Sequence, residues 1–224
     1  MAGSSTDDAT FEGWVDWVFN HPVTEPAWYQ DQNAERWAAS PVVVLNNITR
    51  LFEESPARLV VFSDAQADQG LWFLAFGYFD QGLSTLWEEG VLRSQRERCL
   101  RSIYVLFEQY FAVRCTPRVS DADGPNENPL NMSCYMWWDL LHHHADSPDG
   151  RVGSDMDSEV LLTLERILKL NHDACRRSAL HGLGHWRDYC PAEATAIIDR
   201  FLEENPNLHP ELRTYALESR AGVV

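Results

Sequence analysis

The densest group of chemically active residues lies between Cys175 and Trp186, a segment that contains His181 and His185. Side chains four residues apart on a helix share one face. Imidazoles on one helical face can ligate zinc, iron or nickel when neighbouring helices supply further ligands. The metalloprotease motif is absent, because Gly182 stands where that motif has glutamate. The spacing therefore predicts a paired-histidine site without naming its reaction.

Further ligand candidates come from a second histidine group. His144 lies ten residues after Cys134, just as His185 lies ten residues after Cys175. If the two segments are equivalent packed helices, their axes are about 8–10 Å apart and the two imidazoles face each other. Asp139 and Asp188 are plausible extra carboxylates. The candidate ligands for one transition metal, such as zinc or iron, are His144, His181, His185, Asp139 and Asp188.

A packing interpretation competes with the metal site. Histidines at the end of a helix, as at 142–144, interact favourably with the negative pole of the helix dipole. Gly182 and Gly184 each cost about 1 kcal/mol relative to alanine inside a helix, and the close approach of a neighbouring helix is the favoured compensation. The alternative compensation is room for a ligand. The sequence favours a protein without a cofactor and keeps the transition metal as the alternative.

Acidic pairs give a second candidate site. The net charge is −16, which disfavours binding to nucleic acid and to anionic membranes and suits a basic protein partner. Three glutamate pairs recur near predicted helix ends, where Arg58 and Arg93 are candidates to neutralise the first two. If they are not neutralised, the pairs form an acidic ridge for a basic protein. The ridge residues are Glu53, Glu54, Glu88, Glu89, Glu203 and Glu204.

Aromatic residues give a third candidate. The chain has nine tryptophans, and helical spacing assigns most of its aromatic side chains to the core. The alternative is a pocket for a small ligand or cofactor near Trp137, Trp138 and Trp186.

Repeated helices are expected to position these residues. The sequence Leu51–Ser55 is echoed 35 residues later by Leu86–Gly90, and Cys99, Cys134 and Cys175 begin apolar stretches 35 and 41 residues apart. A period of this size with two helices per unit is typical of an α-solenoid. The pattern resembles HEAT-like and armadillo-like repeats, and the segment 178–186 is similar to one in uncharacterised bacterial repeat proteins. We expect an all-α fold with about five two-helix repeats.

The expected domain organisation follows from this period. Residues 1–9 are predicted to be a disordered tail, and residues 10–224 form one domain with an N-terminal helical cap at 10–40 and repeats at 41–224. Within the cap, a helix is expected from Trp28 to Ala38. First helices are predicted at 41–54, 79–89, 157–170 and 191–204, with a degenerate one between the second and third of these. Second helices are predicted at 64–78, 94–112, 132–145, 173–187 and 208–220.

The remaining features narrow the function. Five dispersed cysteines without a CxxC pair, no secretory signal and no long apolar run predict a cytoplasmic protein with reduced thiols. No phosphate-binding, dinucleotide-binding or nucleophile-elbow motif occurs. The favoured function is a non-enzymatic protein-binding module. Within this class, an acidic inhibitor or immunity-type protein is the specific candidate. A metal-dependent enzyme and a small-ligand carrier remain alternatives, and the oligomeric state stays open.

Overall fold

The regular secondary structure of the described part of the chain is entirely helical. The computed structural model describes residues 6–31, 33–76, 81–117, 128–141 and 156–224, and these residues form helices, turns and connections without a strand. The all-α prediction is therefore confirmed. None of the described helices is both long and apolar enough to cross a membrane.

The α-helices are α1 Thr6–Phe19, α2 Pro41–Glu53, α3 Ser55–Leu59, α4 Asp64–Phe76, α5 Arg93–Leu106, α6 Ala112–Arg114, α7 Leu130–Met136, α8 Asp157–Leu168, α9 Asp173–Trp186, α10 Pro191–Glu204 and α11 Pro210–Ala221. Short 3-10 segments are η1 Trp28–Gln30, η3 Leu83–Trp87 and η5 Trp137–Leu141, and a π-helical segment, η4 Phe107–Phe111, joins α5 to α6.

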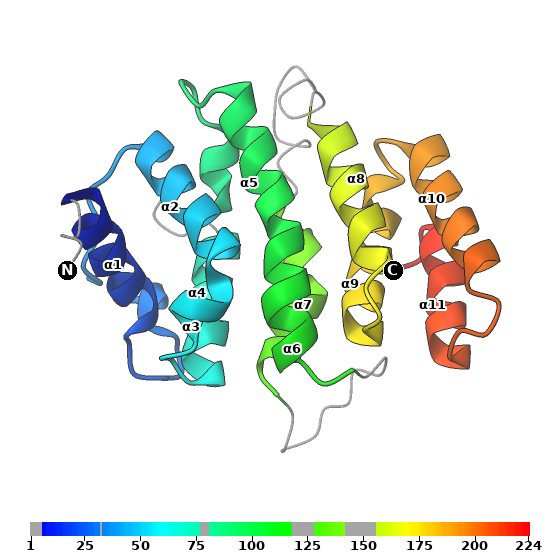
Figure 1. Ribbon diagram of the computed structural model, residues 1–224, viewed down its shortest axis with the longest axis horizontal. Coiled ribbons are helices and arrows are strands. Elements are labelled where there is room, and N and C mark those ends of the chain that lie inside the picture. Colours follow the sequence, from blue (N-terminus) through cyan, green and yellow to red (C-terminus); the bar gives the residue numbers. More distant parts are fainter. Residues whose placement is uncertain (1–5, 32, 77–80, 118–127, 142–155) are drawn as a thin grey trace.

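The helices are arranged in two rows (Figure 1). In one row α2 contacts α5, α5 contacts α8, and α8 contacts α10. In the other row α4 contacts α7, α7 contacts α9, and α9 contacts α11. Contacts of α8 with α9 and of α10 with α11 join the rows, and α1 packs on α2 and α4 at one end. Consequently α9 lies between α7 and α11 and against α8.

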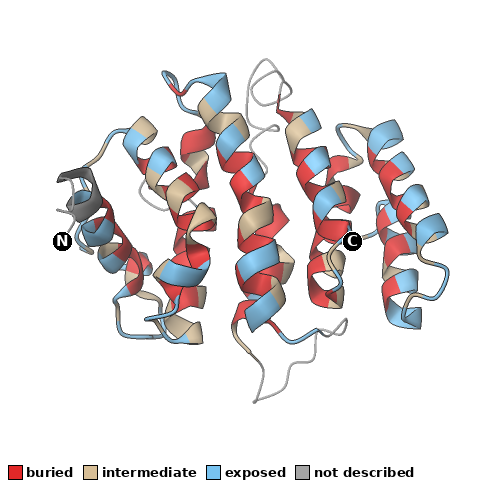
Figure 2. Cartoon of the chain, viewed as in Figure 1, coloured by how far each residue is buried: buried red, intermediate tan, exposed pale blue. Residues whose placement is uncertain are grey.

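The core lies between the two rows, as the buried residues in Figure 2 show. Helix α2 illustrates why, because Val44, Leu45, Ile48, Leu51 and Phe52 recur at helical spacing and are all buried. Such an apolar stripe stabilises a helix mainly through the packing of its face. Pro41 stands in the first turn, where its missing N–H costs nothing.

Several predicted elements differ from the observed ones. The helix expected at 79–89 is a 3-10 segment over Leu83–Trp87, with residues 77–80 outside the described part. Gly90, at φ 87°, ends this region in the left-handed conformation that favours glycine. The helix expected over 28–38 is observed only as Trp28–Gln30. Helix α1 begins at Thr6, within the predicted tail, and residues 1–5 lie outside the described part.

The predicted repeat register is wrong between residues 79 and 112. Helix α5 lies in the same row as α2, α8 and α10, the row of predicted first helices, although it was assigned as a second helix. Each row therefore holds four helices in the part of the chain that the structure describes, rather than the five expected. The register differs because Leu86-Trp87-Glu88-Glu89 repeats the local sequence of α2's end but follows a 3-10 segment, Leu83–Trp87, rather than closing an α-helix like α2.

Candidate metal centre

Helix α9 is the most enclosed element near the site. It contacts α7, η5, α8, α10 and α11. Its N-cap is His172, whose Nδ1 accepts a hydrogen bond from the Cys175 backbone N–H at 3.4 Å. A Cβ added at Gly182 would lie 2.7 Å from Trp138 Cγ and 2.8 Å from Leu164 Cδ2. Gly182 therefore permits close helix packing, as expected, and brings the adjacent His181 next to η5.

Three potential ligands converge where α9 meets η5. His185 Nε2 lies 2.8 Å from Asp139 Oδ1, and His181 Nε2 lies 3.0 Å from Asp139 Oδ2. The two Nε2 atoms are 3.1 Å apart. Among the described residues this is the one group of three or more histidine, cysteine or acidic side chains whose ligand atoms lie within 4.8 Å of one another. Both imidazoles therefore direct the same nitrogen toward the carboxylate.

The separations fit a metal ion. With metal–ligand bonds of about 2.0–2.2 Å, ligand atoms are separated by roughly 3.3 Å in a tetrahedral site and roughly 3 Å in an octahedral one. The observed separations of 2.8, 3.0 and 3.1 Å are close to these values. Two histidines with one carboxylate form the set found in catalytic zinc sites and in non-haem iron sites.

The centre is enclosed on one side and open on the other. The side chain of His181 is 7% exposed, whereas those of His185 and Asp139 are 26% and 23% exposed. Burial raises the pKa of Asp139, but hydrogen bonds with His181 and His185 outweigh it and hold that pKa well below its usual range. Asp139 is therefore ionised at neutral pH, the form that a metal ligand requires.

Two tyrosines orient the buried imidazole. The Tyr215 hydroxyl lies 2.7 Å from His181 Nδ1, and the Tyr135 hydroxyl lies 2.9 Å from that of Tyr215. The Arg177 guanidinium lies over both tyrosine rings, 4.4 and 4.7 Å from their centroids. A hydrogen bond to the far nitrogen of a metal-bound histidine fixes the ring and its tautomer. Sequence reasoning missed Tyr215, because nothing in the local pattern places α11 against α9.

The other predicted ligands are not in this group. His144 lies outside the described residues. Asp188 is exposed, two residues after the end of α9, and is not a member of the three-ligand cluster. Of the five predicted ligands, the structure brings together Asp139, His181 and His185.

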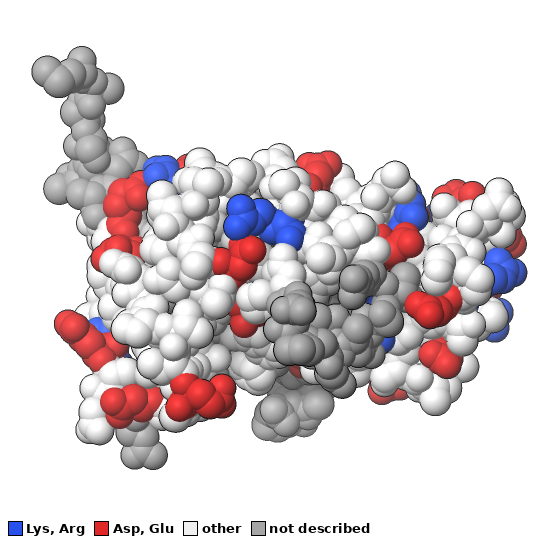
Figure 3. Space-filling model, turned by 90° about the horizontal axis from the view of Figure 1, so that it is seen from below, with Lys and Arg blue, Asp and Glu red and all other residues white. Residues whose placement is uncertain are grey.

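The predicted acidic ridge is partly neutralised. Glu53 pairs with Arg98 at 2.7 Å, and Glu54 pairs with Arg50 at 2.9 Å and with Arg58. Glu88, Glu89, Glu203 and Glu204 are exposed. Acidic and basic side chains are interspersed on the face drawn in Figure 3.

The three tryptophans of the predicted ligand pocket are core residues. Trp137, Trp138 and Trp186 are at most 1% exposed. Phe107 lies against both Trp137 and Trp138, and Trp186 Nε1 donates to Asp157 Oδ1 at 3.4 Å. Their rings thus contribute packing between the helix rows.

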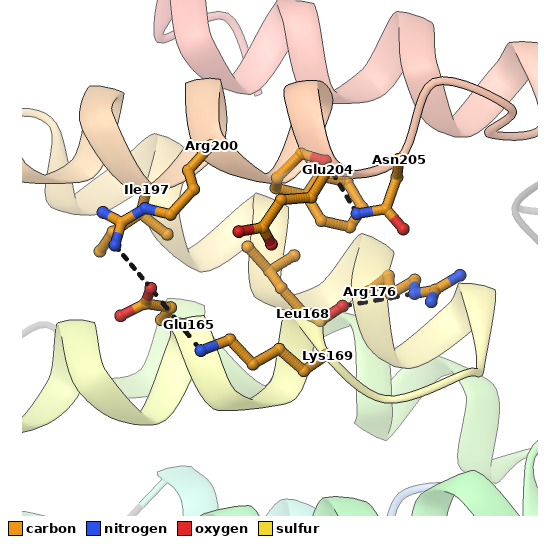
Figure 4. Close-up of a pocket in the computed structure, with 9 residues that line it drawn as sticks. Glu165, Leu168, Lys169, Arg176, Ile197, Arg200, Glu204 and Asn205 are labelled. Atoms are coloured by element: carbon orange, nitrogen blue, oxygen red, sulfur yellow. Dashed lines mark hydrogen bonds and ion pairs between the residues drawn. The ribbon is translucent and has the colours of Figure 1, made fainter.

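A surface pocket of about 260 Å³ lies between α8 and α10 (Figure 4). Leu168, Ile197 and Phe201 supply its apolar wall. Glu165 pairs with Arg200 at 3.1 Å and with Lys169 at 3.8 Å. The lining therefore holds both charges, with Lys169, Arg176 and Arg200 beside Glu165 and Glu204.

No protein-family model matches the chain, and comparison with curated proteins and with solved structures gives no significant match. The geometry of the site is therefore the basis for a functional proposal.

Proposed function

We propose that this protein is an α-helical metalloprotein that binds one divalent transition metal ion through Asp139, His181 and His185. The observation that carries the proposal is the convergence of two Nε2 atoms and a carboxylate at separations of 2.8 to 3.1 Å. The low pKa of Asp139 supports it, because a negative charge is retained beside two imidazoles.

The ligand number indicates what the ion can do. Structural zinc sites are closed by four protein ligands, whereas catalytic sites keep a position for water or substrate. Three ligands, with His185 and Asp139 partly exposed, suit an open site. An ion held there would polarise a bound oxygen and lower the pKa of bound water. His181 would be the fixed ligand, because Tyr215 holds its other nitrogen.

The test is direct metal binding. Purified protein, freed of metal by a chelator, is titrated separately with Zn²⁺ and, without oxygen, Fe²⁺. We expect one equivalent to bind, with the affinity reduced at least about 100-fold in Asp139→Asn and His185→Ala. Asp188→Asn, at an exposed position outside the cluster, is the matched control and should bind as the unaltered protein does. No binding of either ion, or equal binding by Asp139→Asn, would disprove the proposal.

A second proposal retains a basic protein partner. The net charge of −16 and the exposed Glu88, Glu89, Glu203 and Glu204 support it. The two helix rows also favour an α-solenoid resembling HEAT-like repeats, a class that uses extended surfaces for binding. A cytoplasmic location belongs to the same proposal, since all five cysteines are free. Failure of a low-salt pull-down to recover any basic protein would argue against this function.

A further inference from the structure

A chain of hydrogen bonds leads from the buried histidine of the metal centre to tyrosines on two other helices. The Tyr215 hydroxyl of α11 lies 2.7 Å from His181 Nδ1, and the Tyr135 hydroxyl of α7 lies 2.9 Å from that of Tyr215. On the other side of the ring, the two oxygens of Asp139 lie 3.0 and 3.2 Å from His181 Nε2. Both nitrogens of one buried imidazole therefore have a fixed partner.

The rings of this chain hold one another in place. The centroid of the His181 ring lies 4.6 Å from that of Tyr135 and 6.4 Å from that of Tyr215, on which it is stacked. Arg177 lies one turn before His181 on α9. Its guanidinium is 4.4 Å from the Tyr135 centroid and 4.7 Å from the Tyr215 centroid, and a cation over an aromatic face is attracted to it. Three helices thus fix the positions of both hydroxyls.

These partners determine where the proton of His181 lies when no ion is bound. A carboxylate only accepts hydrogen bonds, and an unprotonated Nε2 would place its lone pair against both Asp139 oxygens. A neutral His181 therefore carries its proton on Nε2. Its Nδ1 is then an acceptor, so Tyr215 donates to Nδ1 and Tyr135 donates to the Tyr215 oxygen.

A metal ion on Nε2 requires the opposite arrangement. Histidine binds a metal as the neutral ring through an unprotonated nitrogen, so the proton of His181 must then lie on Nδ1. The Nδ1–H group donates to the Tyr215 oxygen, and the Tyr215 hydroxyl donates to the Tyr135 oxygen. The ring is neutral in both forms, and only the position of its proton and the direction of two hydrogen bonds change.

We propose that Tyr215 and Tyr135 are positioning residues whose hydrogen-bond chain reverses when His181 binds a metal ion, and that this reversal sets how tightly the ion is held. The inference rests on the proposed metal function. Tyr215 can accept from Nδ1–H because the Tyr135 oxygen is placed to take its own proton. Loss of the Tyr215 hydroxyl removes the acceptor of a buried N–H group, which is costly.

The reversal can be read directly by NMR of the full-length protein. Protein labelled with ¹⁵N at histidine is freed of metal by a chelator and studied at about pH 8, where imidazole is ordinarily neutral, before and after addition of Zn²⁺. Long-range ¹H–¹⁵N spectra distinguish protonated from unprotonated ring nitrogens, and His181→Gln assigns the signals of His181. We expect Nε2–H in the metal-free protein and Nδ1–H in the Zn²⁺-loaded protein. A proton on Nδ1 in both forms, or on both nitrogens of the metal-free protein, would overturn the proposal.

Matched tyrosine variants test the effect on affinity. Tyr215→Phe keeps the ring and removes the hydroxyl, and it should lower the Zn²⁺ affinity at least about tenfold, the effect of losing an outer partner of a metal-bound histidine. Tyr135→Phe leaves Tyr215 as the acceptor and should lower the affinity only about threefold. Tyr104→Phe removes a hydroxyl that is bonded to Glu108 on another helix, and it should bind Zn²⁺ as the unaltered protein does.

The outcomes separate this inference from the metal function. Absence of Zn²⁺ binding by the unaltered protein would disprove the metal function and the inference with it. If the unaltered protein binds Zn²⁺ and Tyr215→Phe binds it as tightly as Tyr104→Phe does, the inference alone is wrong. Urea unfolding establishes that Tyr215→Phe is folded, and the spectra of the unaltered protein test the reversal without any tyrosine variant.

Discussion

Helices α5 and α9 carry the same Cys-x-x-Ser sequence, but the serine hydroxyl donates to its own helix in α5 and to a neighbouring helix in α9. On α5, the Ser102 hydroxyl donates to Cys99 O of its own helix at 2.6 Å. On α9, the equivalent hydroxyl of Ser178 donates across the interface to Cys134 O. Burial raises the pKa of Cys99 to about 12, whereas Cys175, with Cys134 and His172 beside it, has a lowered pKa.

The charged residues show the same contrast. Arg98 and Arg101 of α5 are exposed and form ion pairs with Glu53 and Glu159 on neighbouring helices. On α9, His181 is buried and meets Asp139 and Tyr215 inside the protein. Polar groups that interact in the interior have fewer competing waters and a lower local dielectric. The identity of the neighbours, rather than the motif itself, therefore decides where chemistry is possible.

The largest predicted effect is an increase in the stability of the folded protein when a metal ion binds to the histidines of α9. At a free Zn²⁺ concentration 100 times the dissociation constant, binding should stabilise the folded state by about 3 kcal/mol. For a chain of this size that corresponds to a rise of roughly 5–10 °C in Tm, measured by differential scanning calorimetry. His185→Ala should abolish the rise, because it removes one of the three ligands.

An α5 variant provides the control for this measurement. Arg101→Ala removes an exposed ion pair and leaves the α9 cluster unaltered, so the Zn²⁺-dependent rise should persist. An equal loss of the rise in Arg101→Ala and His185→Ala would contradict the contrast between the two helices.

The second prediction concerns the packing of α9. Gly182→Ala gains about 1 kcal/mol of helix propensity but places a methyl group against the Trp138 ring, 2.7 Å from Cγ. Overpacking of this kind outweighs the gain, and we expect a net destabilisation of about 2 kcal/mol in urea unfolding.

Gly13→Ala on α1 is the matched substitution. A Cβ there would lie 3.5 Å from its nearest neighbour, Trp37, which is an ordinary contact. This variant should be stabilised by up to about 1 kcal/mol. A stabilised Gly182→Ala protein would show that α9 is not held as closely as the distances indicate.

The sequence predicted the helices of the second half of the chain well, because apolar spacing, prolines and caps act locally. Residues 157–168, 173–186 and 191–204 are helical within a few residues of their predicted bounds. It also identified Asp139, His181 and His185, since histidine spacing on one helix is visible in the chain. Tyr215 was not predicted, because its contact with His181 depends on which helices become neighbours.

The repeat register failed for the same reason. Leu86-Trp87-Glu88-Glu89 has the residue types of a helix end, but Gly82 and Gly90 flank a segment too short for a helix that could enter a row. The sequence period alone does not determine which helices become neighbours. In the structure α5, rather than the segment Leu83–Trp87, lies in the row between α2 and α8. The HEAT-like resemblance and the basic-partner function stay predictions.

The third prediction tests Asp68, a half-buried carboxylate whose hydrogen-bond partners among the described residues, Ser133 and Trp72, are neutral. Asp68 of α4 accepts a hydrogen bond from Ser133 of α7. Burial raises its pKa to about 6, from an ordinary 3.8, although hydrogen bonds with Ser133 and Trp72 lower it in part. This is the reverse of Asp139, where two histidines more than offset burial.

The raised pKa of Asp68 makes the stability of the folded protein decrease as pH rises. Between pH 3.8 and about 6 the folded protein holds the Asp68 proton more tightly than the unfolded chain. Its contribution to stability is thus full below pH 3.8 and declines as pH rises to about 6. Asp68→Asn should be more stable than the unaltered protein by about 1–2 kcal/mol at pH 7.5, and this difference should shrink towards pH 4. Exposed Asp16→Asn should show no comparable gain in urea unfolding, and a gain that grew towards low pH would refute the assignment.

The smallest predicted effect returns to the surface of α5. Arg101 donates to both carboxylate oxygens of Glu159, at 2.9 and 2.8 Å, but its side chain is 54% exposed. Water and salt screen such a pair, so a double-mutant cycle with Arg101→Ala and Glu159→Ala should give a coupling energy below about 1 kcal/mol. The coupling should fall further in 1 M NaCl, where the screening length is about 3 Å. A coupling of about 2 kcal/mol that resisted salt would mean that α5 also carries its charges in a protected environment, and the distinction from α9 would fail.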